Sequence, residues 1–572
     1  MKVFVGPQMS LVSGYGSSLD VALGAMGDGR SALRPQVWDG SYDPVGYYAQ
    51  RVDSPPAADG LSRLEGMMAA ALADCMRGNG PRDGRRAGLI ISTTKGNISE
   101  AGAEPPEAGS RVFLHTMGLR MAQAVGLEAR PLLISNACIS GVAAVIVASR
   151  LIRRGEYDDI FVLGADELSR FVTSGFLSFR SVSRNKCLPF DLRRDGLSLG
   201  EAAGCILLTN NAERGAEVAI EGGSLTDDAN HISGPSRTGE PLSVAMRRAL
   251  EQSGRDGRGL AFVNPHGTGT AYNDEMEAKA IGLAGLENAP VNSLKTYFGH
   301  TLGASGLIEL MVCAKELTAG RLLPTLGYRQ AGVSVPLRVS GEAQATTGDF
   351  CLKTASGFGG CNAAVVMSKA ADARDVEPVS DGAWSLARSV DMARGQLLVD
   401  GRAILPDDAA RDFDTLAREA YHKLEAPNVK FFKMDDLCKM GYIGAEYLLQ
   451  GIDADEETLR DAAILLANRS ASLDTDIKYV RSMEANEASP AKFVYTLPNI
   501  VIGEICIRHK IMGETLFVIT PWRDMESLKR LASEALDTSR SKQLICGWCE
   551  KLGDEYELHM ELLTKDRNGI LP

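Results

Sequence analysis

The chain has 572 residues, of which 45% are hydrophobic, and its formal net charge at pH 7 is −12. This length accommodates several domains, and the acidic balance argues against a nucleic-acid partner. Because the chain shows no run of roughly 18 apolar residues, no secretory signal and no disulfide framework among its eleven cysteines, we expect a reduced, cytoplasmic protein with no membrane span.

The first notable pattern is the stretch PLLISNACISGVAAVIVASRLIRRGEYDDIFVLGADE at 131–167. It predicts a buried strand, a turn, a helix and a second buried strand. Cys138 lies at the turn, where free N–H groups and the positive end of the helix dipole would favour a nucleophilic thiolate. A small buried core cysteine is the alternative interpretation.

Two histidines lie at similar turns further along the chain. FVNPHGTGTAYND ends a strand at His266 and enters a Gly/Thr loop, and KTYFGHTLGASG places His300 before a helix that begins near Ala304. Open α/β sheets bind ligands at the carboxyl ends of their strands, so we expect Cys138, His266 and His300 to share one site. A lone histidine is more often structural, and no Cys/His spacing here is typical of zinc, so no metal is expected.

The composition changes after residue 370. Residues 371–382 are polar and aperiodic, which predicts a linker, and residues 383–572 contain less glycine and more charge. The strand-like run AILLANRSASLD at 463–474 begins an order of elements that weakly parallels the first half of the chain. We interpret the tail as a degenerate second copy of that half, with chance similarity as the alternative.

Five motifs, in this order, resemble those of the β-ketoacyl synthases of the thiolase superfamily. They are NACISG around Cys138, PFDLRRDGLSLGEAAG at 189–204, HGTGTAYND at 266–274, KTYFGHTLGASG at 295–306 and GFGGCNAAVV at 357–366. The resemblance covers nearly all of residues 1–370. It implies an α/β, thiolase-like fold of five α-β-α-β-α layers, with a nucleophile-bearing half at 1–212 and a histidine-bearing half at 213–370. An additional α/β, half-thiolase-like domain is expected at 383–572.

The resemblance also implies a role for each matching residue. Cys138 would accept the acyl chain, and His266 and His300 would act on the malonyl unit. Lys295 matches the motif lysine that supports the site, and Glu309 matches a structural acid near that lysine.

Three further residues match positions around the substrate. Phe358 matches a gating phenylalanine, and its N–H and that of Cys138 are the candidate oxyanion hole. Thr268 and Thr270 match residues that contact a phosphopantetheine arm. The implied partner is an acyl carrier protein whose phosphopantetheine carries the substrates, and no bound cofactor is expected.

The implied activity is that of an acyltransferase, a 3-oxoacyl-[acyl-carrier-protein] synthase of class EC 2.3.1. It would join a malonyl-carrier thioester to a cysteine-bound acyl chain by decarboxylative Claisen condensation, in fatty-acid-like, polyketide or aryl-polyene elongation. The alternatives are a non-catalytic scaffold or chain-length factor, and a thiolase acting on CoA esters. Thiolases carry a GHP histidine motif, whereas Thr301 follows His300 here, and Cys361 is interpreted as a core residue.

The tail resembles a chain-length factor, the inactive partner of aryl-polyene synthases. It carries ASPAKFVYTLPNIVIGEI at 488–505, similar to a Ser-Pro stretch that helps form the dimer interface and acyl tunnel of typical synthases and that the short first half lacks. Near its equivalent of the nucleophile position stand Trp522 and Arg523, which cannot accept an acyl group. We expect either a homodimer or a pseudo-heterodimer within one chain; a structural appendage is the alternative.

Two remaining features have competing interpretations. Cys546 and Cys549 form a C-x-x-C motif within a strand-like run, which disfavours a redox function. A set of arginines could dock an acidic carrier protein, or could simply be a solvated helix face. These arginines are Arg150, Arg153, Arg154 and Arg184.

Overall fold

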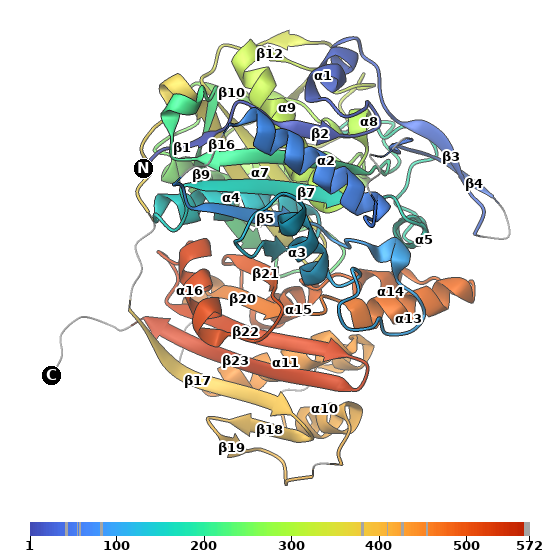
Figure 1. Cartoon of the computed structure of the whole chain (residues 1–572), viewed down its shortest axis with the longest axis vertical. Helices are drawn as coiled ribbons and strands as arrows, with labels where there is room; N and C mark the ends of the chain where they lie inside the picture. Colours follow the sequence, from blue (N-terminus) through green and yellow to red (C-terminus); the bar gives the residue numbers. More distant parts are fainter. Residues whose placement is uncertain are drawn as a thin grey trace.

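The computed structural model describes residues 1–40, 44–53, 55, 59–80, 84–378, 383–408, 410–424, 428–452 and 456–565. Residues 379–382 of the predicted linker therefore lie outside the described residues. Among the described residues, no helix is long and apolar enough to cross a membrane. The framework consists of three groups of paired strands, which we call the first, second and third sheets and which share one order and one set of strand directions (Figure 1).

The first sheet contains the strand that leads to Cys138. Its strands, in spatial order, are β6 (Leu132–Ile134), β5 (Ala87–Ser92), β7 (Asp159–Asp166), β8 (Ala202–Thr209) and the pair β1 (Val3–Val5) and β2 (Ser10–Val12). Strands β6, β5 and β7 are parallel, whereas β8 runs antiparallel to β7 and to β1 and β2. Every residue of β7 and β8 is buried, as expected for strands covered on both faces.

The other two sheets repeat this order and these directions. The second contains β11 (Pro290–Val291), β10 (Leu260–Asn264), β15 (Phe350–Ser356), β16 (Cys361–Lys369) and β9 (Val218–Asp227). The third contains β21 (Thr515–Ile519), β20 (Ala463–Asn468), β22 (Gln543–Leu552), β23 (Glu555–Lys565) and β17 (Trp384–Ala393). In each sheet the first three strands are parallel and the last two alternate in direction.

The first sheet joins the other two at its opposite edges. Strand β1 pairs antiparallel with β9 of the second sheet. Strand β6 pairs antiparallel with β21 of the third, with Ile134 opposite Val518 and Leu133 opposite Ile519. Figure 1 shows the third sheet, in orange and red, below the blue and green part of the chain. The strand preceding the candidate nucleophile is therefore held from one side by the C-terminal region, by which we mean residues 383–565.

Helices cover both faces of the sheets and create the layers. Helices α4 (Ser140–Arg153) and α9 (Ser305–Ala319) pack on each other between the first two sheets, and α16 (Met525–Ala535) packs on α4. Every residue of α4 is buried. The outer helices are α2 (Arg63–Gly78), α3 (Leu114–Ala124), α6 (Glu240–Gln252), α7 (Ala271–Leu283), α11 (Asp436–Leu449) and α15 (Ile500–His509). Helix, sheet, helix, sheet and helix thus form the five predicted layers.

Small residues allow the two central helices to begin in close contact. A Cβ on Gly141 of α4 would lie 2.7 Å from the backbone N of Leu307, and one on Gly306 of α9 would lie 2.5 Å from Cγ2 of Val142. Neither position has room for a side chain, because real Cβ atoms do not approach so closely. These contacts bring the loops before α4 and α9, which carry Cys138 and His300, next to each other.

The remaining elements are short connections and additions at the edges. The strands are β3 (Arg34–Trp38), β4 (Val45–Ala49), β12 (Arg321–Leu322), β13 (Arg338–Val339), β14 (Gln344–Ala345), β18 (Gln396–Val399) and β19 (Arg402–Ala403). The helices are α1 (Leu19–Gly27), α5 (Arg170–Ser178), α8 (Lys295–Phe298), α10 (Phe413–His422), α12 (Glu456–Arg460), α13 (Leu473–Glu484) and α14 (Pro490–Val494). Short 3₁₀ turns include η2 (Ala137–Ile139) and η4 (Leu302–Ala304).

Candidate active site

The loop between β6 and α4 presents Cys138. The residue lies in η2, just before the first residue of α4. Ala137 has a positive φ of 47°, a conformation that costs a non-glycine residue on the order of 1–3 kcal/mol. Ser140 stabilises this turn, because its Oγ accepts from the N–H of Asn136 at 2.8 Å and donates to the carbonyl of Ala137 at 2.7 Å. The strained turn directs Cys138 out of the sheet toward the histidine loops.

The two predicted histidines meet at the sulfur of Cys138. Nε2 of His300 lies 3.1 Å from Sγ of Cys138. The rings of His266 and His300 are 4.9 Å apart, centre to centre, and nearly perpendicular at 83°. One donor atom from each of the three side chains lies within 4.8 Å of the others. The structure thus brings together three residues that are far apart in the sequence.

Buried charges support the histidines from behind. Nζ of Lys295 donates to the carbonyl of His266 at 2.8 Å, lies 3.4 Å from its Nδ1, and forms an ion pair with Glu309. Glu309 also pairs with Lys353, at 2.6 Å. Although burial opposes the charge of Glu309, the two lysines hold its pKa below the ordinary value. Lys353 did not appear in the sequence-based prediction, because it lies alone in β15 outside any motif.

Both imidazoles are neutral. Burial, with a contribution from the charge of Lys295, lowers the pKa of His266 and that of His300 well below the ordinary value. The lysine ammonium close to Nδ1 of His266 leaves that nitrogen as the acceptor, so Nε2 carries the proton. The site therefore holds neutral N–H donors rather than cations.

Burial opposes the resting Cys138 thiolate that the helix start predicts. Burial raises the pKa of the thiol to about 12, an effect that outweighs the favourable charge of Lys295 and the N–H groups of Phe358 and Cys138. Cys138 is half-buried, and the sequence pattern indicated the helix start but not the cost of burying part of the thiol. The nucleophile must therefore form by proton transfer, and Nε2 of His300 is placed to accept the proton.

Two backbone N–H groups converge on the sulfur. A Cβ added to Gly357 would lie 3.0 Å from the backbone N of Cys138, so the loop carrying Phe358 passes directly over the nucleophile. The N–H groups of Phe358 and Cys138 are near enough to the sulfur to oppose the rise in the pKa of the thiol. Two such donors are what an oxyanion hole requires, so that role stays a prediction for these N–H groups.

Aromatic side chains surround Phe358. Its ring stacks on Phe176 of α5, with centres 6.1 Å apart, and packs on Phe179 at 5.4 Å. Phe493, in α14 of the C-terminal region, packs on both Phe176 and Phe179. The sequence predicted Phe358 from its motif, whereas Phe176 and Phe179 lie in a segment without a motif and Phe493 lies in the Ser-Pro-like stretch of the tail. The C-terminal region thus reaches the surroundings of the site.

The Gly/Thr loop after β10 lies beside the histidines. Thr268 and Thr270 contact each other through their hydroxyl oxygens at 2.9 Å. Gly269 has a φ of +81°, and a Cβ there would lie 2.9 Å from the carbonyl of Gly196. Glu277 of α7 accepts from the N–H groups of His266 and Gly267 at 2.6 and 2.7 Å, and sequence reasoning did not identify it.

The docking prediction was wrong for Arg150 and Arg153. Arg150 is 6% exposed and pairs with Glu514 of the C-terminal region at 2.6 Å. Arg153 is 7% exposed and donates to the carbonyl of Ile220 at 2.6 Å. Arg154 is half-buried and donates to the carbonyl of Ser533. The third sheet and α16 cover this end of α4, so the helix is not a solvated face.

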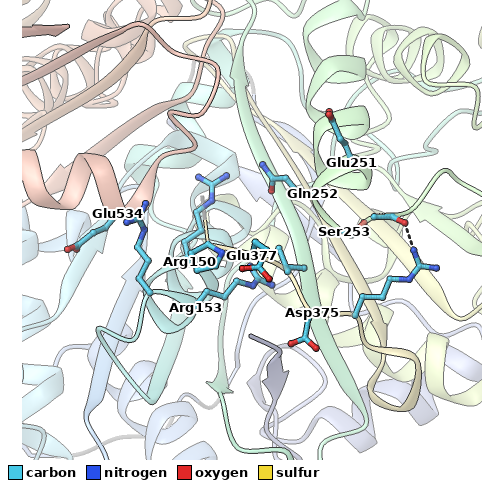
Figure 2. A pocket seen from close by; sticks show the side chains of 13 residues that line it. Arg150, Arg153, Glu251, Gln252, Ser253, Asp375, Glu377 and Glu534 are labelled. Carbon is cyan, nitrogen blue, oxygen red and sulfur yellow. Dashed lines mark hydrogen bonds between the residues drawn. The ribbon is translucent and has the colours of Figure 1, made fainter. Parts of the chain in front are cut away.

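A cavity of about 400 Å³ adjoins these arginines, and Cys138 is not among its lining residues (Figure 2). Carboxylates, among them Glu251, Asp375, Glu377 and Glu534, line it together with the arginines. The negative carboxylates offset the positive arginines, so the cavity does not present the basic surface that an acidic carrier requires. Arg184 lies elsewhere, beside a wide groove next to α5.

Metal binding and redox chemistry were also considered for the cysteines. The thiol of Cys138 and the imidazoles of His266 and His300 are groups that zinc can bind. Among the described residues, their donor atoms lie close enough together to hold one metal ion. That no metal is needed stays a prediction.

Cys546 and Cys549 are buried in β22, and every cysteine is a free thiol in the part of the chain that the structure describes. Trp522 stacks on Arg130, and Arg523 pairs with Glu557.

Sequence comparisons match two stretches between residues 55 and 329 to the two domains of one known family. The model of the β-ketoacyl synthase N-terminal domain matches residues 55–214, and that of the β-ketoacyl synthase C-terminal domain matches residues 218–329. The tetracenomycin polyketide synthase ketoacyl synthase alpha subunit of Streptomyces glaucescens is 31% identical over 328 residues, which is 52% of this chain and 76% of that protein. The 3-oxoacyl-[acyl-carrier-protein] synthase 2 of Staphylococcus aureus is 33% identical over 41% of this chain and 60% of its own length.

Solved structures resemble the chain over two different lengths. The ketosynthase ApeO in complex with its chain length factor ApeC, from Xenorhabdus doucetiae, has a TM-score of 0.58 and 25% identity, and the match covers 64% of this chain and 98% of that one. The keto synthase–chain length factor PfaC has a TM-score of 0.76 over 99% of this chain and 78% of its own; at 14% identity it shows the fold alone. The predicted thiolase-like fold class, with its additional α/β part, is confirmed.

Proposed function

Because the chain belongs to the β-ketoacyl synthase family of acyltransferases, we propose that Cys138, His266 and His300 carry out its decarboxylative condensation. The observation that carries the proposal is the sulfur of Cys138 at 3.1 Å from Nε2 of His300, with a second neutral imidazole adjacent. A scaffold without catalysis and a CoA-ester thiolase are not favoured.

The first step transfers an acyl chain to Cys138. The thiol proton passes to Nε2 of His300 as the sulfur attacks the carbonyl carbon of a carrier thioester. The N–H groups of Cys138 and Phe358 stabilise the negative charge that develops on the carbonyl oxygen. When the tetrahedral intermediate collapses, the bond to the carrier sulfur breaks, and that sulfur takes the proton from His300.

The second step generates a carbon nucleophile from a malonyl thioester. His266 presents its Nε2–H to the thioester oxygen. His300 also donates from Nε2, as the neutral tautomer with its single proton moved from Nδ1 to Nε2, because the acylated sulfur no longer needs a proton acceptor. Carbon dioxide leaves as the electron pair moves onto the enolate. One such donor contributes on the order of 3 kcal/mol. Neutral imidazoles suit this task, since the burial that lowers their pKa also strengthens their hydrogen bonds.

The third step forms the new carbon–carbon bond. The enolate carbon attacks the acyl carbonyl on Cys138, whose oxygen again faces the two backbone N–H groups. The sulfur leaves as a thiolate and regains a proton from solvent, while the product stays on the carrier as a β-ketoacyl thioester. Carbon dioxide release from malonyl-carrier tests this sequence, because a thiolase would release none.

We assign the parts of the chain as the sequence predicts: synthase halves at 1–212 and 213–370, a linker at 371–382 and a chain-length-factor-like domain at 383–572. The antiparallel pairing of β6 with β21 supports a pseudo-heterodimer within one chain. A cytoplasmic location and substrates carried on phosphopantetheine complete the proposal, with Thr268 and Thr270 beside the arm.

Phe493 is the residue through which the C-terminal region would limit chain length. A Cβ on Gly175 of α5 would lie 2.2 Å from its ring, so Phe493 fills the space beside the gating aromatic residues. We expect Phe493→Leu to lengthen the products by at least one two-carbon unit, measured by mass spectrometry of the carrier-bound chains. The control is Phe413→Leu in α10; unchanged products in Phe493→Leu would contradict this role.

The acidic carrier protein would dock at the groove beside α5. This groove, of about 1220 Å³, lies between β3, β4, α5 and residues 483–488, and Arg170, Arg180 and Arg184 line it. Arg170 pairs with Asp39 at 3.0 Å. Arg180 and Arg184 are exposed, which leaves their charges available to an acidic partner. Phe176, on the same helix α5, faces the gate, so the groove adjoins the site.

Charge reversal tests the docking groove. Arg180→Glu with Arg184→Glu is expected to raise KM for an acyl-carrier substrate about tenfold and to leave kcat with a small pantetheine thioester unchanged, because the surface charges act on encounter with the carrier. The effect should weaken at high salt. Arg258→Glu, at an exposed arginine paired with Asp256, is the control. Equal effects on both substrates would contradict docking at the groove.

A further inference from the structure

We propose that Asn499, in the C-terminal region, is a positioning residue of the oxyanion hole, holding the loop 357–360 so that the N–H of Phe358 faces Cys138. The inference rests on the proposed function and extends it. It makes the C-terminal region a participant in acyl transfer, in addition to any effect on chain length.

The contact is direct and buried. Asn499 is 2% exposed and stands at the N-terminus of α15, and its Nδ2 donates to the carbonyl of Phe358 at 2.8 Å. Its Oδ1 has no hydrogen-bond partner among the described residues. The side chain of Asn499 therefore holds the loop through the hydrogen bond that its Nδ2 donates to Phe358.

Helix α15 and the loop are in close contact. Gly359 has a φ of +92°, and a Cβ there would lie 2.5 Å from Nδ2 of Asn499. One turn further along α15, a Cβ on Gly503 would lie 2.6 Å from the carbonyl oxygen of Gly359. Glycines at both positions allow the helix and the loop to meet backbone to backbone.

Hydrogen bonds hold the peptide groups on both sides of the Phe358 N–H. The N–H of Gly357 donates to the carbonyl of Cys361 at 2.9 Å. On the other side, the carbonyl of Phe358 accepts from Asn499, and the N–H of Gly359 donates to Ile232 at 2.7 Å. Because both neighbouring peptide planes are held, the plane that carries the Phe358 N–H has little freedom to turn.

The C-terminal region also holds the second half of the oxyanion hole. Oδ1 of Asn136, two residues before Cys138, accepts from the N–H of Phe517 in β21 at 2.8 Å. The N–H of Ser135 donates to the carbonyl of Phe517 at 3.2 Å. Both N–H groups of the hole therefore depend on anchors in the third sheet and its helix.

Substitutions at Asn499 in the full chain separate positioning from folding. In Asn499→Leu, of similar size but without a donor, we expect kcat for acylation of Cys138 by a small acyl-pantetheine thioester to fall about 30-fold, with KM unchanged, because a displaced oxyanion donor loses part of the 10²- to 10³-fold effect of removing one. Carbon dioxide release from malonyl-carrier should change less than about threefold, since that enolate contacts the histidines.

The pH dependence of acylation distinguishes a positioning role of Asn499 from a merely structural one. In Asn499→Asp, acylation relative to the unsubstituted protein should recover as the pH falls, because only a protonated carboxyl can donate to the carbonyl of Phe358. Arg540→Gln, which removes an exposed ion pair with Glu251 across the same interface, is the control and should change neither rate.

Two results would overturn the inference. One is normal acylation in Asn499→Leu. The other is an equal loss of acylation and carbon dioxide release together with a lower urea midpoint, which would indicate a folding defect. If the unsubstituted protein neither acylates nor releases carbon dioxide, the proposed function fails instead, so the two failures are distinguishable.

Discussion

Cys138→Ala is expected to lose acylation completely and to reduce condensation by at least about 10⁴-fold. The sulfur is the atom that both N–H groups and Nε2 of His300 face, and no other side chain of the site can form an acyl thioester. Carbon dioxide release from malonyl-carrier should persist, because His266 and His300 remain and the enolate does not need the sulfur. Incubation with acyl-carrier followed by intact-protein mass spectrometry measures the first effect.

The control for this experiment is the neighbouring thiol of Cys361. It is buried, and its Sγ lies 3.4 Å from the carbonyl of Phe358. Cys361→Ala should keep acylation and condensation, since that thiol is not placed as a nucleophile. An acyl group on Cys361 in the Cys138→Ala protein would show that the nucleophile was assigned to the wrong residue.

Removing either histidine should slow decarboxylation by about 10²- to 10³-fold, the effect of losing one donor to a developing oxyanion. The two variants should differ in the first step. His300→Ala is expected to slow acylation as well, because Nε2 of His300 is the proton acceptor nearest to the sulfur. His266→Ala should acylate at close to the normal rate, because His300 is the histidine in hydrogen-bond contact with the sulfur, whereas Nδ1 of His266 faces Lys295.

Single-turnover acylation and carbon dioxide release measured on the same samples separate these effects. His422→Ala, at an exposed position in α10, is the control and should change neither rate. Identical losses in both steps for His266→Ala and His300→Ala would contradict the division of roles. Normal carbon dioxide release in either variant would remove that histidine from the enolate site.

Much of the site could be predicted because its chemistry is carried by local motifs. Cys138 follows β6 and His266 follows β10, as predicted, whereas His300 follows the short helix α8. The two strands belong to different sheets, and the packing of α4 on α9 brings their loops together. Phe358 and Lys295 were predicted from the same short motifs. The fold class could be predicted as well, because alternating buried strands and helices leave few layered arrangements.

What could not be predicted depends on contacts between distant segments. Arg150 and Arg153 have the sequence of a basic helix face, but α16 and the third sheet cover that face, and Glu514 supplies a partner from 364 residues away. Lys353 and Asn499 act through contacts with segments far away in the sequence, and the pattern around each residue does not indicate those partners. The thiol of Cys138 was expected to be ionised because a helix start favours a thiolate, whereas the cost of burial depends on the assembled fold.

The most direct test follows the mass of the intact protein through one cycle. The protein is first incubated with acyl-carrier and then with malonyl-carrier, while carbon dioxide is measured. We predict an acyl adduct on Cys138 that disappears in the second step as one carbon dioxide is released for each chain extended by two carbons. An adduct that forms on another residue, or one that is released from Cys138 without carbon dioxide, would contradict the condensation.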